Sequence, residues 1–477
     1  METKVPTTVL IKGGTIVTAT DKYEADIFVS GETIQTIGLN LEVTADKVID
    51  AKGKYIFPGG IDPHTHMELP FMGTHSSDDF ETGTRAGLYG GTTTIIDFAI
   101  QNQGNTLNAI IEEYHRKASK AVGDYAFHLG VTDFNSGTKE EIKDIILKKG
   151  ISSFKVFMAY KGALMVDDRQ IMELMTETGR YGGMVIAHCE NGDIIDGLVK
   201  EHLAAGKIEP KYHGICHPEL AEAEASGRFI DLAHHTKSPC YIVHMTCEGA
   251  LNKVKDATKR NQKVNVETCI QYLVLNDELY ERPGFEASKW IFSPPLRKPK
   301  DQEALWASIR QGIVHTVGTD HCPFCMDQKR MGEKDFSKIP NGAPMIENRM
   351  EVLFSEGVVK GRISLNKFVE ISSTNAAKIF GMFPKKGAIA IGSDADLVIF
   401  DPNEKHTISA ETHHMRCDYN GFEGMEVTGK TKTVLLRGTV AIENGKALVG
   451  SGFGKFVHRA AHNVELRREN ERRASDD

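Results

Sequence analysis

The sequence lacks any apolar run close to the roughly 20 residues that a membrane helix needs. Its first residues, Met1–Pro6, contain neither the basic stretch nor the long apolar stretch of a secretory signal. It also lacks an excess of positive charge, because the formal net charge is −8, which provides no basic surface for nucleic acid or an anionic membrane. We therefore expect a cytoplasmic protein whose partner is a small molecule or another subunit.

Cysteine is sparse, with 8 residues in a chain of 477, and does not reach the density of a disulfide scaffold. We expect most of these cysteines to be reduced thiols in or near the core. Cys322-Pro323-Phe324-Cys325 has CxxC spacing, but no second pair follows and a thioredoxin-like setting is absent. We interpret this motif as structural or incidental.

The two ends of the chain share one texture of short β-runs split by glycine. It covers Thr8–Asp50 and returns in Asp396–Phe400 and Thr433–Val440. Isolated small sheets are marginally stable, so we expect both ends to build one small β-sandwich together. The predicted division is residues 1–55 and 386–455 for the β-sandwich, 56–385 for a barrel, and 456–477 for a tail that is solvated or frayed, mainly over Glu465–Asp477.

Between these ends, β-runs alternate with helical stretches such as Gln302–Gln311, a pattern typical of a parallel sheet. Eight is the strand number of a (β/α)8 barrel, although periodicity alone does not distinguish a closed barrel from an open doubly wound sheet. The eight candidate strands are Tyr55–Ile61, Thr92–Phe98, Tyr125–Val131, Ser153–Phe157, Met184–Ala187, Cys240–Val243, Lys263–Val266 and His315–Gly318.

Candidate metal ligands follow several of these strands. His64 and His66 come after the first strand, and residues two apart on an extended segment project to the same side. His188, His244 and Asp320 follow three other strands. Each alone is more often a structural residue, but their convergence at the carboxyl ends of one parallel sheet would be typical of a metal site. Imidazole with carboxylate favours zinc, with manganese, cobalt or iron as alternatives, and five ligands suggest two ions.

Lys155 is exceptional because it lies in the apolar strand Phe154–Met158. The lysine could bury only its methylene chain and keep its amino group near solvent. Beside two cations, however, an ammonium would be strongly disfavoured. A neutral amine can add carbon dioxide, and the resulting carbamate could bridge two metals.

The chain resembles the hydantoinase and dihydropyrimidinase family of the amidohydrolase superfamily over nearly its whole length, and is most like the D-hydantoinases. The motifs that carry this resemblance are Asp62–His66, Ser153–Tyr160, Ser293–Arg297, Gly318–Cys322 and Ile339–Gly342. It implies a barrel with a β-sandwich, two zinc ions per subunit, and a homotetramer or homodimer. It also implies that His64, His66 and Asp320 bind the more buried metal, that His188 and His244 bind the other, and that carboxylated Lys155 bridges them.

The same resemblance implies roles in substrate binding. Tyr160 would stabilise the oxyanion, and Ser293 and Asn341 would position the ring amide. A pocket for the exocyclic substituent would contain Leu69, Phe71, Phe157 and Leu164, which could equally be packing residues. A metal-bridging hydroxide would attack the ring carbonyl of a hydantoin or 5,6-dihydropyrimidine, while Asp320 passes the proton to the leaving nitrogen. The product would be an N-carbamoyl amino acid.

Three alternatives remain. The metal ligands alone do not distinguish an allantoinase from a hydantoinase or dihydropyrimidinase. Dihydroorotases resemble the chain in HxH but carry an arginine two residues later for the substrate carboxylate, where this sequence has Glu68, an acid that we expect to repel such a substrate. A non-catalytic scaffold of the same fold would lack the metal ligands, whereas all six are present here.

Overall fold

A computed structural model describes residues 7–461 of the protein. Eight parallel strands form one sheet, each beside the next in the chain, in the order β15-β14-β13-β12-β11-β10-β9-β6. A parallel bridge between Thr65 on β6 and His321, in the loop after β15, links the two edges of this sheet, so the barrel is nearly closed. The strands are β6 (Gly60–Thr65), β9 (Thr92–Ile100), β10 (Asp124–Gly130), β11 (Ser153–Phe157), β12 (Met184–His188), β13 (Cys240–Ile242), β14 (Asn265–Cys269) and β15 (Thr316–Gly318).

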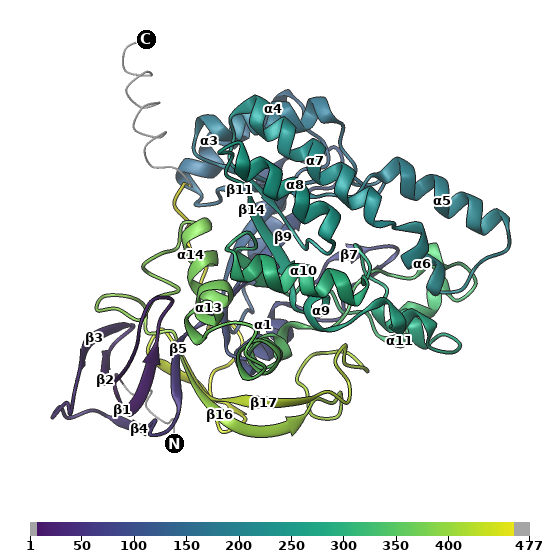
Figure 1. The fold of residues 1–477 in the computed structure, drawn as a ribbon. Helices are drawn as coiled ribbons and strands as arrows, with labels where there is room; N and C mark the ends of the chain where they lie inside the picture. Colours follow the sequence, from purple (N-terminus) through teal and green to yellow (C-terminus); the bar gives the residue numbers. More distant parts are fainter. Residues whose placement is uncertain (1–6, 462–477) are drawn as a thin grey trace, which may run out of the picture.

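Helices alternate with the strands and surround them (Figure 1). The amphipathic helix α4 is an example, because Asp167 caps its start and Ile171, Leu174 and Met175 form its buried face. The helices are α1 (Phe80–Tyr89), α2 (Leu107–Ala118), α3 (Ser136–Lys148), α4 (Asp168–Arg180), α5 (Gly192–Ala204), α6 (Lys211–Cys216), α7 (Glu219–Thr236), α8 (Glu248–Lys259), α9 (Ile270–Val274), α10 (Pro299–Arg310), α11 (Met326–Lys329), α12 (Arg349–Leu353), α13 (Leu365–Val369) and α14 (Asn375–Ile379). No helix among residues 7–461 has the length and apolar character to cross a membrane.

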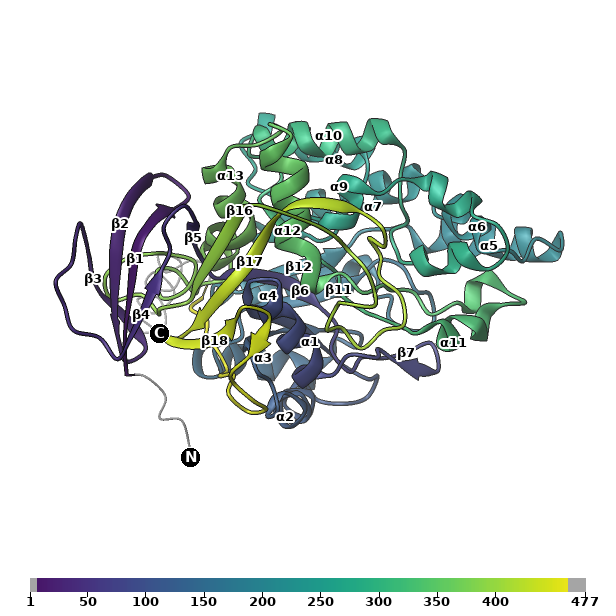
Figure 2. The same cartoon turned by 90° about the horizontal axis from the view of Figure 1, so that it is seen from below.

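A second sheet combines strands from both ends of the chain, in the order β19-β18-β17-β16-β5-β1-β2-β3, with β4 beside β1 (Figure 2). The two halves meet where β5 pairs antiparallel with β16. Its strands are β1 (Thr8–Val17), β2 (Lys22–Ser30), β3 (Thr33–Gly38), β4 (Lys47–Asp50), β5 (Tyr55–Pro58), β16 (Leu397–Thr407), β17 (Glu426–Leu436), β18 (Thr439–Glu443) and β19 (Lys446–Ala447). The predicted fold class, a barrel with a small β-domain from both termini, is confirmed.

The predicted first strand, residues 55–61, is wrong as a single element. β5 belongs to the terminal sheet, and β6 begins the barrel at Gly60. Gly59 lies between β5 and β6, where the chain passes from one sheet to the other. A Cβ atom at this position would lie only 2.1 Å from the Thr93 hydroxyl, so the change of sheet requires glycine there. A continuous apolar run gives no sign of such a change of sheet.

Two other predicted segments have different bounds in the structure. The strand predicted at Lys263–Val266 lies later, at Asn265–Cys269. Residues 456–461 are described and contact the barrel, because the amide of Val457 donates to the carbonyl of Tyr125 over 2.7 Å. The rest of the predicted tail, residues 462–477, lies outside the described residues.

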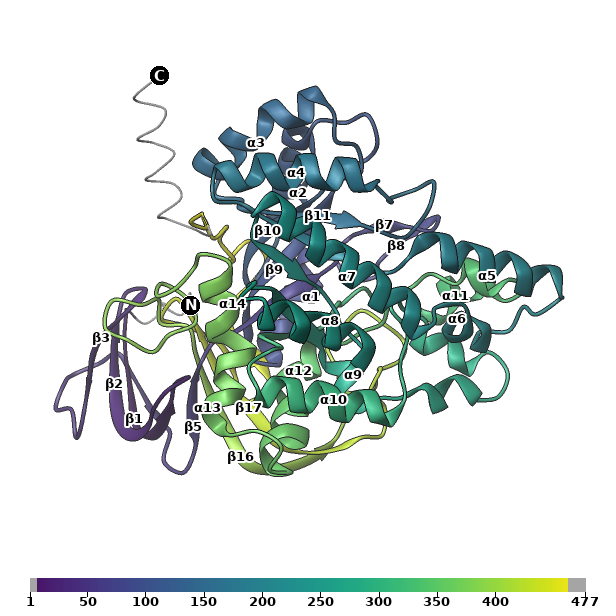
Figure 3. The same cartoon turned by 45° about the horizontal axis from the view of Figure 1, so that its top comes forward.

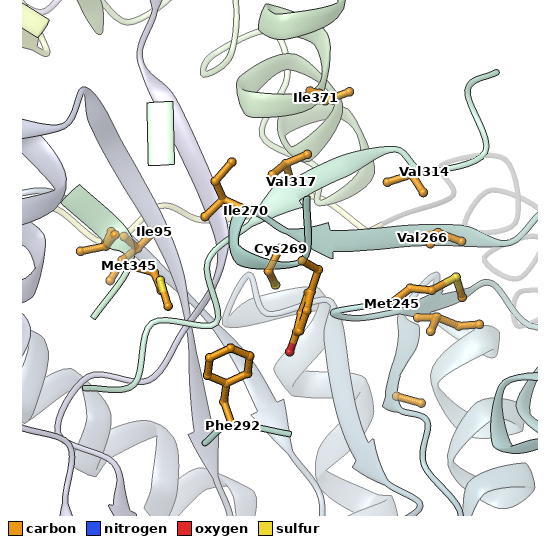
Figure 4. Packing of buried hydrophobic residues seen from close by; sticks show 14 of the residues in the cluster. Ile95, Met245, Val266, Cys269, Ile270, Phe292, Val314, Val317, Met345 and Ile371 are labelled. Carbon is orange, nitrogen blue, oxygen red and sulfur yellow. The ribbon is translucent and has the colours of Figure 1, made fainter. Parts of the chain in front are cut away.

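The core follows the alternation of side chains along the strands. On β10 and β11, Phe127, Phe154 and Val156 point outward and pack in the large cluster between strands and helices. Figure 4 shows part of this cluster, including Val266 and Cys269 on β14, Val317 on β15 and Phe292. The residues that alternate with Phe127, Phe154 and Val156 on their strands point into the barrel, and they include the ionisable side chain of Lys155.

The two ends of the barrel differ. The sheet formed by the termini lies on one side, whereas α5, α6, α11 and the short hairpin of β7 (Pro70–Phe71) and β8 (Thr74–His75) lie on the other (Figures 1 and 3). In barrel enzymes, active sites lie at the carboxyl ends of the strands.

Candidate active site

One cavity at the carboxyl ends of the strands contains every residue that the sequence analysis assigned to metal or substrate. Its walls include residues from β6, β11 and β12 and from the loops that follow β11, β13 and β15. The predicted residues that line it are His64, His66, Leu69, Phe71, Lys155, Phe157, Tyr160, Leu164, His188, His244, Ser293, Asp320 and Asn341. Ile100, Phe292, Cys322 and Gly342 complete the lining.

His64, His66 and Asp320 form one group of potential ligands. The Nε2 atoms of both histidines lie 3.1 Å from the same oxygen, Asp320 Oδ1. Although burial raises the pKa of Asp320, the two imidazoles hold that pKa well below its usual range. The group therefore presents an ionised carboxylate and two imidazoles around one point, a donor set that suits a divalent transition metal.

Glu267 determines which nitrogen of His64 faces this point. Its Oε1 atom accepts a 2.6 Å hydrogen bond from His64 Nδ1, so the lone pair of the neutral imidazole is on Nε2. Burial lowers the pKa of His64, but the charges of Glu267 and Asp320 outweigh this effect and raise the pKa to about 9. The site thus attracts positive charge at Nε2, and a bound cation would take the place of the proton.

His188 and His244 form the second group. His188 Nδ1 and His244 Nε2 lie 2.9 Å apart, and His188 Nε2 donates to Glu190 over 2.9 Å. The second oxygen of Glu190 accepts from His217 at 2.9 Å. Burial lowers the pKa of His188 and of His244, which keeps both imidazoles in the neutral form that binds metal.

Lys155 lies on β11 and is 1% exposed. Its Nζ atom is 4.6 Å from the ring centre of Phe98 and 5.2 Å from that of Phe157. Burial lowers the pKa of Lys155 to about 8. Nearby cations would lower this pKa further, so the amine is available in its neutral form.

Tyr160 joins the polar and apolar parts of the cavity. Its side chain faces the same cavity as those of Ser293 and Asn341, and Asn341 donates to Ser293 over 3.0 Å. Burial raises the pKa of Tyr160, so the phenol stays protonated and can donate. The rings of Phe71 and Phe157 meet Tyr160 edge-on, with centroids 5.7 and 6.0 Å away.

Three cavity residues have left-handed backbone conformations. The φ angles of Tyr160, His244 and Asp320 are 63°, 39° and 52°. Such conformations cost on the order of 1–3 kcal/mol each in residues other than glycine, and they gather at functional sites. Each of these residues follows the end of a barrel strand, where the backbone turns its side chain toward the cavity.

Sequence reasoning missed three residues that support this cavity. Glu267 and Glu190 orient metal-ligand candidates, and both lie in or beside a barrel strand, where a buried acid was a usable signal. Lys329 is fully buried, and its ammonium donates to the carbonyls of Ile291, Pro340 and Gly342 over 3.0, 2.7 and 2.7 Å. It thereby joins the segments that carry Ser293 and Asn341. Nothing in its local sequence identifies that role.

Residues 55–441 match the amidohydrolase family. The chain belongs to this family. This amidohydrolase is 50% identical to a D-hydantoinase of Geobacillus stearothermophilus over 457 residues, which cover 95% of this chain and 97% of the relative. It is 41% identical to a dihydropyrimidinase of Rattus norvegicus over 458 residues, covering 94% and 88% of the two chains. The crystal structure of a dihydropyrimidinase from Brevibacillus agri gives a TM-score of 0.95 at 49% identity and covers 96% of this chain and 99% of its own. The resemblance stated above is confirmed.

The position of Glu68 changes the reason for disfavouring a carboxylated substrate. Glu68 does not line the cavity of this amidohydrolase, because its carboxylate accepts a 2.8 Å hydrogen bond from Lys120. Its charge was expected to repel a carboxylated ring directly. The relevant feature is instead that no arginine is among the described residues that line the cavity.

Proposed function

We propose that this amidohydrolase opens the ring amide of hydantoins and 5,6-dihydropyrimidines and releases N-carbamoyl amino acids. The similarity to a D-hydantoinase and to a dihydropyrimidinase supports this substrate class. The observation that carries the proposal is the single cavity in which both imidazole groups and Asp320 meet Tyr160, Ser293 and Asn341. Metal ligands and amide-binding groups are thus available to one small molecule.

The residues present fit two divalent metal ions, for which we propose zinc, with manganese or cobalt as alternatives. His64, His66 and Asp320 would hold one ion, and His188 and His244 the other. Lys155, as a carbamate, would bridge them. When bound, the ions would polarise the ring carbonyl and supply a water that is ionised near neutral pH.

The chain's own residues would manage the proton and the oxyanion. Asp320 is ionised, so it can accept the proton of the attacking water at a carboxylate oxygen and pass it to the leaving ring nitrogen. The protonated Tyr160 can donate a hydrogen bond to the oxygen that becomes negatively charged. Ser293 and Asn341 lie next to Tyr160 and would orient the amide.

A substrate comparison tests the proposal. Purified, zinc-loaded protein is assayed on dihydrouracil, hydantoin, a bulky 5-substituted hydantoin, allantoin and dihydroorotate. We expect turnover of the first three, little of dihydroorotate because no described cavity residue is an arginine, and at least two metal ions per chain by elemental analysis. Fastest turnover of allantoin would favour the allantoinase alternative, and an inactive, metal-free protein would favour the scaffold.

Lys155 provides a separate test of the bridge. Lys155→Ala should lose metal and nearly all activity, and the native mass of the wild-type protein should include one carbon dioxide. An active two-metal enzyme with unmodified Lys155 would refute the carbamate. We also propose a cytoplasmic homotetramer, with a homodimer as the alternative, which light scattering of the purified protein would distinguish.

A further inference from the structure

Two thiols and a carboxylate meet outside the active-site cavity. The Sγ atoms of Cys325 and Cys417 and a carboxylate oxygen of Asp418 all lie within 4.8 Å of one another. Cys325 belongs to the CxxC motif, whereas the other two residues come from a distant segment. Both thiols are partly exposed and Asp418 is exposed, so ions from solvent can reach the three groups.

The surrounding contacts hold these groups in place. The backbone amide of Met326 donates to both oxygens of Asp418, over 2.9 and 3.3 Å. The thiol of Cys325 donates to the carbonyl of Arg416, and that of Cys417 to the carbonyl of Phe324, both at 3.8 Å. The two segments therefore contact each other reciprocally, and no long side chain has to become ordered when an ion binds.

A cation that binds thiolate would displace the protons of both thiols, as metals generally do at such sites.

We propose that Cys325, Cys417 and Asp418 form a second metal site, selective for a soft divalent cation such as zinc or cadmium. Two metal–sulfur bonds and one metal–oxygen bond form, thiol protons are released to solvent, and water occupies the fourth position. With metal–sulfur bonds of about 2.3 Å and tetrahedral angles, the sulfur atoms would lie about 3.8 Å apart. That separation is compatible with the observed limit of 4.8 Å.

The site would connect two segments near the active-site cavity. Cys325 begins the segment of α11, which contains Lys329, and Cys322 lines the cavity three residues earlier. The opposite segment is held at Arg416, whose amide donates to Asp78 over 2.9 Å. Asp78 in turn accepts from His321 at 3.0 Å. A bound ion would therefore cross-link a segment that supports the cavity without contacting the substrate.

Alkylation of the wild-type protein tests this site without any variant, after dialysis against a chelator has removed metal from the exposed thiols. N-ethylmaleimide should modify Cys325 and Cys417 in the absence of added cadmium, and one equivalent of cadmium should protect both, as measured by peptide mass spectrometry. Equal modification of both thiols with and without cadmium would overturn the proposal.

Absorption provides an independent measurement. One cadmium per chain should produce a thiolate-to-cadmium charge-transfer band that Cys325→Ser and Cys417→Ser each remove or strongly reduce. Asp418→Asn should weaken binding but retain a band, whereas Asp256→Asn, a change at an exposed aspartate on α8, should leave it unchanged. A full band in both cysteine variants would refute the site, and if either variant fails to fold, the wild-type protection result decides.

Discussion

Replacing Glu267 by glutamine should weaken metal binding by about 10- to 100-fold, the loss typical when the partner of a metal-binding histidine is changed. The Glu267 carboxylate accepts from His64 Nδ1 at 2.6 Å, from the His244 amide at 3.1 Å and from the Tyr241 hydroxyl at 2.9 Å. Glutamine retains the size and one acceptor oxygen but removes the charge, and charge-assisted hydrogen bonds are roughly twice as strong as neutral ones. The expected loss corresponds to about 1.4–2.8 kcal/mol of binding free energy.

Competition between the protein and a zinc-binding dye measures this affinity directly, and elemental analysis gives the metal content. Glu177→Gln is a matched control, because Glu177 is a buried acid on α4 that pairs with Arg180 and does not line the cavity. Thermal unfolding at saturating zinc separates a loss of affinity from a loss of folding. Wild-type zinc affinity in a folded Glu267→Gln protein would refute the idea that this carboxylate orients His64 for metal.

Four other changes test separate parts of the site. Tyr160→Phe should lower kcat by about 100-fold or more with metal content intact, and an unchanged kcat would remove Tyr160 from oxyanion stabilisation. Phe71→Ala should alter the preference between bulky and unsubstituted rings, and equal effects on all rings would place the substituent elsewhere. Lys329→Met should raise KM more than it lowers kcat, because it releases the segments of Ser293 and Asn341; a uniform loss that follows unfolding would indicate a purely structural lysine. The rate of Cys325 alkylation should rise with pH and reach half its maximum near pH 7, because Cys417 lowers the pKa of this thiol to about 7 and the thiolate is the reactive form. In Cys417→Ala the midpoint of this rise should return toward about 8.5.

The inward-facing candidate ligands could be predicted because the side chains of a strand alternate between its two faces. Phe154 and Val156 are outward packing residues, so Lys155 between them must point into the barrel. The same rule places His64 and His66 on one side of an extended segment. Residue type and strand position were therefore enough to collect these side chains at one end of a parallel sheet.

The supporting contacts could not be predicted in this way. Glu267 and His64 are 203 positions apart, on strands that are not neighbours in the sheet, and only the closed barrel brings them together. The predicted strand also ended at Val266, one residue before this acid. For Lys329 the partners are three backbone carbonyls, and a carbonyl acceptor leaves no pattern in the sequence.

The backbone conformation at three strand ends bears on the function of the residues there. Tyr160, His244 and Asp320 all have positive φ, a conformation that glycine would adopt without a steric penalty. Nearby hydrogen bonds hold the strained turns, such as that from the Met245 amide to the Glu267 carbonyl at 2.8 Å. If stability alone determined these positions, glycine or asparagine would be favoured. A tyrosine, a histidine and an aspartate at these three turns are explained by the cavity that they face, because each provides a group that the proposed reaction needs.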